Sequence, residues 1–115
     1  MMSSAEQASN AAPDAVLRAL ADPHRRAILR LVQHDELPAG QIASNFELTQ
    51  QAVSQHLTVL KRAGLLDERR EGTRRLYFFR SAALEPLRDL LEEFWPDALG
   101  RLKRVVEEAH PRETR

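Results

Sequence analysis

The chain has 115 residues, of which 43% are hydrophobic, and its 17 basic and 17 acidic side chains give a formal net charge of zero. This length fits one domain with a small core, and such domains often gain stability by dimerising. The absence of cysteine excludes disulfides, thiol nucleophiles and cysteine-rich metal sites, and it fits a reducing cytoplasm. Because no apolar run approaches the roughly 20 residues that span a membrane, and no signal-peptide pattern is present, we expect a cytoplasmic protein with no membrane partner.

The charges are distributed unevenly along the chain. Residues 1–46 carry four basic and five acidic groups. Residues 47–80 carry seven basic and four acidic groups, and residues 81–115 carry six basic and eight acidic groups. The middle third therefore has a net charge of +3, between flanks of −1 and −2. A locally positive surface attracts phosphate, although a solvated charged face would give the same pattern.

The N-terminal part predicts a tail followed by a helix. Residues 1–12 are rich in Ser, Ala, Gln and Asn without an apolar period, which predicts a disordered tail and leaves residues 13–110 for the folded domain. Apolar side chains at helical spacing predict a first helix over residues 13–21: Val16, Leu17 and Leu20.

A second helix is expected to begin at Asp22-Pro23 and to run to about His34. Asp is a good N-cap, and Pro suits the first helical position because its missing N–H would have no partner there. The helical period turns one set of residues inward (Ala27, Ile28, Leu31, Val32) and another outward (Arg25, Arg26, Arg30).

Two further helices follow, separated by a short turn. After a break at Asp35–Pro38, a short helix is predicted over Ala39–Asn45, and the turn Glu47–Thr49 leads into a longer helix over Gln50–Ala63. The last residue of the turn is a suitable N-cap, and Gly64 is a suitable left-handed C-terminal cap. Two helices joined by a turn of this length have the geometry of a helix-turn-helix.

The period then changes from helix to strand. Leu65–Arg70 and Arg74–Arg80 flank Gly72, which predicts a β-hairpin with the glycine in its turn. Helical spacing of apolar residues resumes after the hairpin, and Pro96 should kink or split this last helix, which Pro111 should end. The predicted fold is mainly α with a small β-hairpin, in the order α-α-α-α-β-β-α.

The helix over Gln50–Ala63 has one apolar face and one polar face. The polar face suits the reading of base edges, since Gln can bond adenine through two hydrogen bonds and Ser can donate or accept. We expect its N-terminal residues to contact bases: Gln50, Gln51, Ser54 and Gln55. We expect the remaining polar residues, and the cap, to contact the DNA backbone: Thr49, Thr58, Lys61 and Arg62. The alternative is a polar face that touches only water.

Two further features bear on this expectation. His56 lies among the apolar residues of its helix, so we expect it to be packed and hydrogen-bonded, with a phosphate contact as the alternative.

The hairpin carries four arginines that could straddle phosphates or enter a minor groove: Arg69, Arg70, Arg74 and Arg75. The alternative for them is a charged hairpin that only keeps the protein soluble.

Three motifs, in order, resemble those of one family. Leu20–Leu29 (LADPHRRAIL) resembles the second-helix signature of ArsR/SmtB-type regulators, and Ala52–Leu57 (AVSQHL) with Ala63–Leu66 (AGLL) is similar to their recognition helix and the start of their wing. Gly72 with Arg74, Arg75 and Tyr77 is similar to the rest of that wing. The resemblance covers roughly residues 13–105. It implies a winged helix-turn-helix homodimer, built through the first and last helices, that binds double-stranded DNA and represses promoters, often its own.

The metal sites known in that family are absent from this sequence. Pro38 and Gly40 occupy the places of the two cysteines of the arsenic-type site, and around Ala82 and Leu84 the carboxylate and histidines of the zinc-type site are missing. Three later residues have a similar spacing but a late register, which we interpret as coincidence: Asp97, His110 and Glu113. We therefore expect no metal and no cofactor.

The C-terminal helix predicts the dimer interface. Phe94-Trp95, followed by Leu99 and Leu102-Lys103, is similar to a branch of the family that lacks these metal sites. An organic effector or a partner protein is conceivable there, but a Trp on an apolar helix is more often part of a dimer core. The expected interface residues are Val16, Leu20, Leu87, Leu91, Phe94, Trp95 and Leu102.

Two other classes of function are alternatives to a DNA-binding regulator. An enzyme has little support, because Ser54 and the nearby histidine lie on opposite sides of their helix and no glycine loop or ligand cluster is present. A winged-helix module that binds only proteins is the second alternative. The polar helix face and the four arginines of the hairpin favour DNA.

Overall fold

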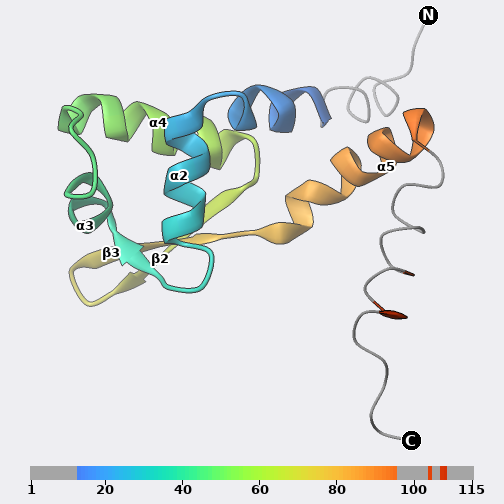
Figure 1. Cartoon of the computed structure of the whole chain (residues 1–115). Helices are drawn as coiled ribbons and strands as arrows, with labels where there is room; N and C mark the ends of the chain where they lie inside the picture. The colour runs from blue at the N-terminus through green and yellow to red at the C-terminus, as the bar shows by residue number, and fades with distance from the viewer. Residues whose placement is uncertain (1–12, 96–103, 105–106, 109–115) are drawn as a thin grey trace, which may run out of the picture.

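The computed structural model describes residues 13–95, 104 and 107–108. The predicted tail over residues 1–12 and the predicted effects of Pro96 and Pro111 lie outside this part of the chain. Helices and a small sheet form the body of the molecule, and a last helix projects from it (Figure 1). None of the described helices is long and apolar enough to cross a membrane.

Residues 13–20 are helical, and α2 (Pro23–Leu31) follows after two residues. As predicted, Asp22 caps α2: one of its carboxylate oxygens accepts hydrogen bonds from the backbone N–H groups of His24 (2.7 Å) and Arg25 (3.3 Å). The helix ends earlier than the predicted His34. Its C-cap Val32 leaves helical geometry, and the carbonyl of Val32 accepts a hydrogen bond from Phe79 in the sheet (3.4 Å).

The sheet contains one strand that was not predicted from the sequence. β1 (Leu37–Pro38) pairs antiparallel with β3 (Arg74–Phe79), and β3 pairs on its other side with β2 (Leu66–Glu71), so the sheet has the order β1-β3-β2. The expected two-stranded hairpin is therefore part of a three-stranded sheet. Pro38 fits an edge position, because it has no N–H to offer a further strand.

The two predicted helices of the helix-turn-helix are present. α3 (Ala39–Ala43) is shorter than expected, and α4 (Gln50–Arg62) has nearly its predicted bounds. Thr49 caps α4 by accepting the N–H of Ala52 (3.0 Å). Gly64 has a φ of +81° and ends α4 in a Schellman motif. In this motif the Leu65 N–H donates to the Leu60 carbonyl (3.0 Å), and the Gly64 N–H donates to the Lys61 carbonyl (3.0 Å). The hairpin consequently starts directly where the recognition helix ends.

The hairpin turn is formed by Gly72 and Thr73, between the paired residues Glu71 and Arg74. Gly72 has a φ of +65°, and no non-glycine residue of the described chain has a positive φ. Gly at the first central position of a two-residue loop is the pattern of a type II′ turn, whose twist matches the two strands.

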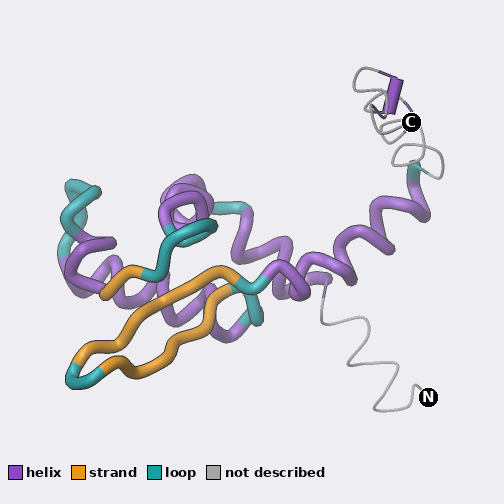
Figure 2. Tube along the Cα trace, turned by 90° about the horizontal axis from the view of Figure 1, so that it is seen from below, coloured by secondary structure: helices purple, strands orange, loops and turns teal. Residues whose placement is uncertain are grey.

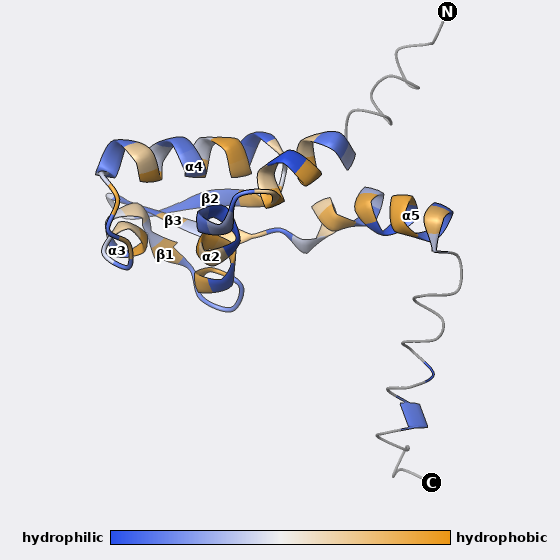
Figure 3. Cartoon of the chain, turned by 45° about the horizontal axis from the view of Figure 1, so that its top comes forward, coloured by the Kyte–Doolittle hydropathy of each residue, from blue (hydrophilic) through white to orange (hydrophobic). Residues whose placement is uncertain are grey.

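The core lies between the helices and one face of the sheet. It joins the first helix, α2 and its C-cap, α3, α4 and the residue before β2 through side chains that are at most 2% exposed: Val16, Ile28, Val32, Ile42, Val53, Leu60 and Leu65. Figure 3 shows hydrophobic and hydrophilic residues alternating along α4, as expected for a helix with one buried face.

The predicted last helix begins later than its apolar spacing suggested. A 3-10 turn, η1 (Ser81–Leu84), leads into α5 (Glu85–Phe94), which ends at the residue before Trp95 and Pro96. Leu84 and Leu87 pack against the core, whereas the far end of α5 extends away from the body. Figure 2 shows the hairpin and α5 projecting at opposite ends of the molecule.

Candidate nucleic-acid interface

The polar face of α4 is open to solvent. All of its predicted contact residues are exposed, while the opposite face is buried through Val53, Leu57 and Leu60. The exposed set comprises Gln50, Gln51, Ser54, Gln55, Thr58, Lys61 and Arg62, with Thr49 exposed at the cap. Within the described chain, no hydrogen bond engages the side-chain amides of Gln50, Gln51 and Gln55, so their donors and acceptors are available to a ligand.

The two threonines differ in what their hydroxyls can do. Thr49 uses its oxygen as an acceptor in capping α4, which leaves its hydroxyl hydrogen free to donate to a phosphate. Thr58 donates its hydroxyl hydrogen to the Ser54 carbonyl (3.0 Å). A phosphate contact by Thr58 would therefore require this hydrogen bond to break.

Glu68 links the recognition helix to the hairpin, a contact that the sequence analysis did not identify. One carboxylate oxygen binds Lys61, and the other lies 3.7 Å from the Arg75 guanidinium. The hydrogen bond to Glu68 raises the pKa of Lys61 above its ordinary value. Two of the predicted backbone-binding cations thus share one carboxylate, whereas Arg62, one position later on α4, has no ion pair within the described chain.

The four arginines of the hairpin are called the wing arginines below: Arg69 and Arg75 form ion pairs, whereas Arg70 and Arg74 are exposed and form none within the described chain. Arg69 pairs with Glu36 and, at 3.4 Å, with Glu71, and these carboxylates raise its pKa. Arg70 stands directly opposite Arg75 in the β2–β3 register. Like charges in directly opposed positions destabilise a hairpin unless an anion lies between them. An anion bound between Arg70 and Arg75 would relieve this repulsion.

The base of the hairpin is held by Arg80 and Asp67. The Arg80 guanidinium approaches one Asp67 oxygen through two nitrogens, at 2.9 and 2.8 Å. A hydrogen bond from the Glu68 backbone, together with this guanidinium, lowers the pKa of the Asp67 carboxyl. The Arg80 guanidinium also lies 5.8 Å from the centre of the Phe78 ring. The backbone N–H of Arg80 donates to the Leu65 carbonyl (2.9 Å), so the hairpin is fixed where it joins α4.

His56 is half-buried and hydrogen-bonded, as predicted. Its Nδ1 atom lies 3.3 Å from an Arg25 guanidinium nitrogen. The prediction that Arg25 faces outward was wrong: its side chain is only 16% exposed and donates to the carbonyls of Ala19 (2.7 Å) and Arg18 (2.8 Å). Both carbonyls lie in the last turn of the first helix, where carbonyls lack the usual helical donors. The Arg18 carbonyl also accepts the Ala21 N–H (3.3 Å), and the arginine adds a donor to each.

The residues predicted to form a dimer interface are in different environments. Leu91 (45% exposed), Phe94 (82%) and Trp95 (58%) present a large apolar surface on the projecting part of α5, and Leu20 and Leu87 are half-buried. Val16 is 2% exposed and belongs to the core of the single chain. Its neighbour Leu17, which was not among the predicted interface residues, is 43% exposed. Leu102 lies outside the described residues.

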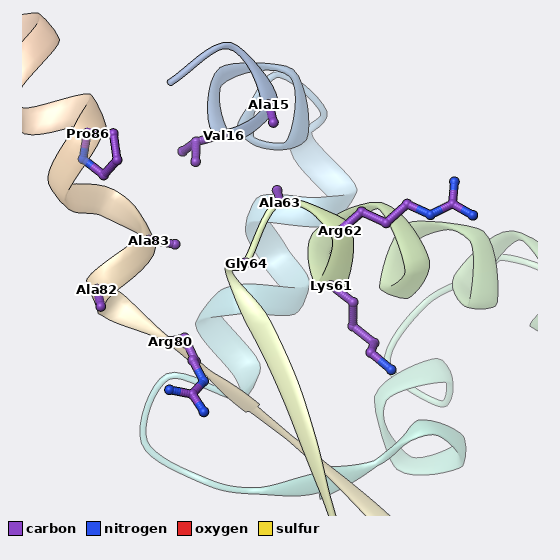
Figure 4. Close-up of a pocket in the computed structure, with 10 residues that line it drawn as sticks. All are labelled: Ala15, Val16, Lys61, Arg62, Ala63, Gly64, Arg80, Ala82, Ala83 and Pro86. Carbon is purple, nitrogen blue, oxygen red and sulfur yellow. The ribbon is translucent and has the colours of Figure 1, made fainter. Parts of the chain in front are cut away.

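A hollow of about 460 Å³ lies between the first helix, the end of α4 and the start of α5 (Figure 4). Small apolar side chains line it together with three cations, two of which are paired with Glu68 and Asp67. Its lining comprises Ala15, Val16, Lys61, Arg62, Ala63, Gly64, Arg80, Ala82, Ala83 and Pro86. Whatever fills this hollow touches both the recognition helix and the base of α5.

The positions of the family's known metal sites hold no ligands here. Pro38 and Gly40 lie in β1 and α3, and Ala82 and Leu84 lie in η1. The coincidental set of Asp97, His110 and Glu113 lies outside the described residues.

The pair α3 and α4, followed at once by the β2–β3 hairpin, defines a winged helix-turn-helix, a fold whose second helix enters the major groove of DNA. A family model described as a helix-turn-helix domain matches residues 20–69. The chain is 41% identical over 95 residues to the HTH-type transcriptional regulator Rv2034 of Mycobacterium tuberculosis, with 83% of this chain and 89% of that protein covered. It is 35% identical over 83 residues to the transcriptional activator HlyU of Vibrio cholerae, with 72% of this chain and 77% of that protein covered. It is 34% identical over 70 residues to the transcriptional repressor SdpR of Bacillus subtilis, with 61% of this chain and 78% of that protein covered.

Solved structures agree with these relatives. An ArsR-like transcriptional regulator from Rhodococcus sp. RHA1 superposes with a TM-score of 0.70 at 25% identity, covering 91% of this chain and 99% of that one. The homodimeric winged helix-turn-helix DNA-binding domain of Mb0332 from Mycobacterium bovis superposes with a TM-score of 0.65 at 28% identity, covering 97% of each chain. The chain belongs to the ArsR/SmtB-type family of winged helix-turn-helix regulators, which are DNA-binding proteins and not enzymes.

Proposed function

We propose that the protein is a homodimeric repressor that binds a specific double-stranded DNA sequence without needing an ion at the family's known metal sites. The observation that carries this proposal is the polar face of α4, on which Gln50, Gln51 and Gln55 are exposed and have no hydrogen-bond partner within the described chain. An exposed row of unsatisfied amides next to a hairpin rich in arginine is what base reading requires.

The roles of the individual residues follow from their positions. Gln50, Gln51, Ser54 and Gln55 lie in the N-terminal part of α4 and would contact base edges. Thr49 and Arg62 are free to bind phosphates directly, whereas Thr58 and Lys61 must first give up contacts within the chain. The wing arginines would bind the backbone or a minor groove beside the recognition helix.

The projecting end of α5 supports dimerisation. Leu91 and Phe94 on α5, and Trp95 at its end, are exposed together within the described part of the chain, and Leu17 adds a further apolar side chain from the first helix. Burying side chains of this size stabilises an interface by about 1.5–3 kcal/mol each. Joining two copies here would leave both recognition helices free, since the hairpin and α5 project at opposite ends (Figure 2).

A two-fold dimer implies a particular kind of operator. Two recognition helices in successive major grooves are about 34–36 Å apart, so we expect an imperfect palindrome with half-sites about one helical turn apart. Repression is the expected direction of control, although the relatives bear the names of an activator and a repressor. An organic ligand or partner protein that fills the hollow of Figure 4 is the second candidate for control, because its lining joins α4 to α5.

The test is selection of purified, chelator-treated protein against randomised duplex DNA at about 150 mM salt, a concentration at which non-specific binding is weak. Enrichment of a palindrome supports the proposal, and its half-sites identify candidate promoters for a repression assay. Absence of enrichment, with only weak salt-sensitive binding, would favour a winged-helix module that binds proteins instead.

A further inference from the structure

A cluster of metal-ligating side chains lies where the start of α2 meets the recognition helix. Asp22, His24 and His56 each offer one ligand atom, and these three atoms lie within 4.8 Å of one another. The Oδ1 atom of Asp22 is 3.7 Å from Nδ1 of His24, and the rings of His24 and His56 are 5.8 Å apart between centroids. Because His56 comes from a different helix, the fold itself creates this cluster.

The distance between the Asp22 and His24 atoms is close to that of a metal centre, and the distances to the His56 atom are at most 4.8 Å. Ligands at the usual bond lengths of about 2.0–2.1 Å in a tetrahedral zinc site are about 3.4 Å from one another. The aspartate and His24 atoms need to close by only a few tenths of an ångström to reach that spacing. The side chain of His24 is 49% exposed and can adjust, and its open side leaves room for water as a further ligand.

The charges around the cluster decide which ions it can hold. A guanidinium nitrogen of Arg25 lies 3.3 Å from His56 Nδ1 and 3.9 Å from Asp22 Oδ2, and the N-terminus of α2 is the positive end of the helix dipole. Both oppose a cation, and one carboxylate cannot outweigh them for Mg²⁺ or Ca²⁺, which require several oxygen ligands. A transition-metal ion bonds strongly to neutral imidazole, so the two histidines can bind it despite these positive charges, whereas they offer little to a hard cation.

We propose that Asp22, His24 and His56 bind one divalent transition-metal ion, Zn²⁺ or Ni²⁺, with water completing its coordination. The site is separate from the places around Pro38, Gly40 and Ala82 where the family resemblance implies ligands. Its distinguishing residue is His24, since Asp22 also caps α2 and His56, on α4, also contacts Arg25 of α2.

An ion at this site would tie the start of α2 to the middle of α4. His56 lies between Gln55 and Leu57, so the tie restrains the helix that carries the base-reading residues. This consequence rests on the proposed function. If DNA binding and ion binding are coupled, each ligand changes the affinity for the other by the same factor.

The experiment uses the full chain without an affinity tag, stripped with a chelator and dialysed. Co²⁺ is titrated while its visible absorption is recorded, and Zn²⁺ or Ni²⁺ is then added to compete. We expect one ion per chain and a loss of affinity of at least about tenfold in His24→Gln. His34→Gln is the matched control, since His34 is an exposed histidine outside the cluster, and it should bind as the wild type does.

Proton NMR of the histidine rings supplies the second measurement. Paramagnetic Co²⁺ should broaden the ring signals of His24 and His56 before those of His34. The proposal is overturned if no ion binds at millimolar concentration, if His24→Gln binds as tightly as the wild type, or if other rings broaden first. None of these readouts involves DNA, so their failure is distinct from failure of the proposed function.

Discussion

Glu68 restrains two of the cations that we assign to the DNA backbone, and its removal should strengthen DNA binding. Lys61 is bonded to one of its oxygens, and Arg75 lies 3.7 Å from the other. In Glu68→Gln both cations lose their counter-charge without a change in side-chain size. They can then bind phosphates without first breaking an ion pair.

The magnitude follows from counterion release. Each additional neutralised phosphate steepens the dependence of log K on log salt by about 0.9, so one or two freed cations steepen the slope by about 0.9–1.8. If wild type and variant converge near 1 M salt, this corresponds to about 5- to 30-fold tighter binding at 0.15 M. Folding stability should change by less than about 1 kcal/mol, because exposed ion pairs contribute little.

Fluorescence anisotropy with the selected operator, measured over a series of salt concentrations, checks the prediction. Glu93→Gln is the matched control, since it makes the same change in net charge at an exposed position on α5, far from the hairpin. The control should keep the wild-type slope. An unchanged slope in Glu68→Gln, or weaker binding at low salt, would refute the assignment of Lys61 and Arg75 to phosphates.

Two other substitutions test the start of α2 and the end of α5. Asp22→Ala should lower the free energy of unfolding in urea by about 1 kcal/mol at pH 7, whereas Asp22→Asn should retain most of the cap. Burial raises the pKa of Asp22, but hydrogen bonds from the His24 and Arg25 backbone and nearby positive charges outweigh it, so the pKa is lowered. The part of this contribution that depends on the charge is therefore complete above about pH 4 and is lost as pH falls further. The deficit of Asp22→Ala should accordingly shrink in acid, and a deficit that does not change with pH would contradict the charge contribution. Phe94→Glu should convert the dimer to a monomer in analytical ultracentrifugation while the circular dichroism spectrum stays unchanged, because Phe94 is 82% exposed in the single chain. Sedimentation as a wild-type dimer would remove this end of α5 from the interface.

The helix-turn-helix could be predicted closely because its signals are local. Asp22 and Thr49 are caps that act on residues two or three positions later, and Gly64 and Gly72 adopt the positive φ angles that other residues avoid. Such signals do not depend on distant parts of the chain. The bounds of α4 and the turn of the hairpin were therefore visible in the sequence.

Features that depend on long-range contacts could not be predicted in this way. β1 is only two residues long and contains Pro38, so its identity as a strand depends entirely on its pairing with β3. Arg25 lies on what a helical wheel marks as an outer face, yet its guanidinium turns inward to donate to two carbonyls in the last turn of the preceding helix. Glu68 counts as one more charge in the sequence, and only the fold shows that it faces Lys61.

The most direct test of the central claim asks whether the exposed face of α4 reads bases. The selection on randomised DNA should be repeated with Gln55→Arg, since Gln favours adenine and Arg favours guanine. If α4 reads bases, the preferred base should change at one symmetric pair of positions and the rest of the palindrome should be retained, whereas Arg62→Gln should weaken binding without changing the preference. Selection of the wild-type sequence by Gln55→Arg would contradict the account.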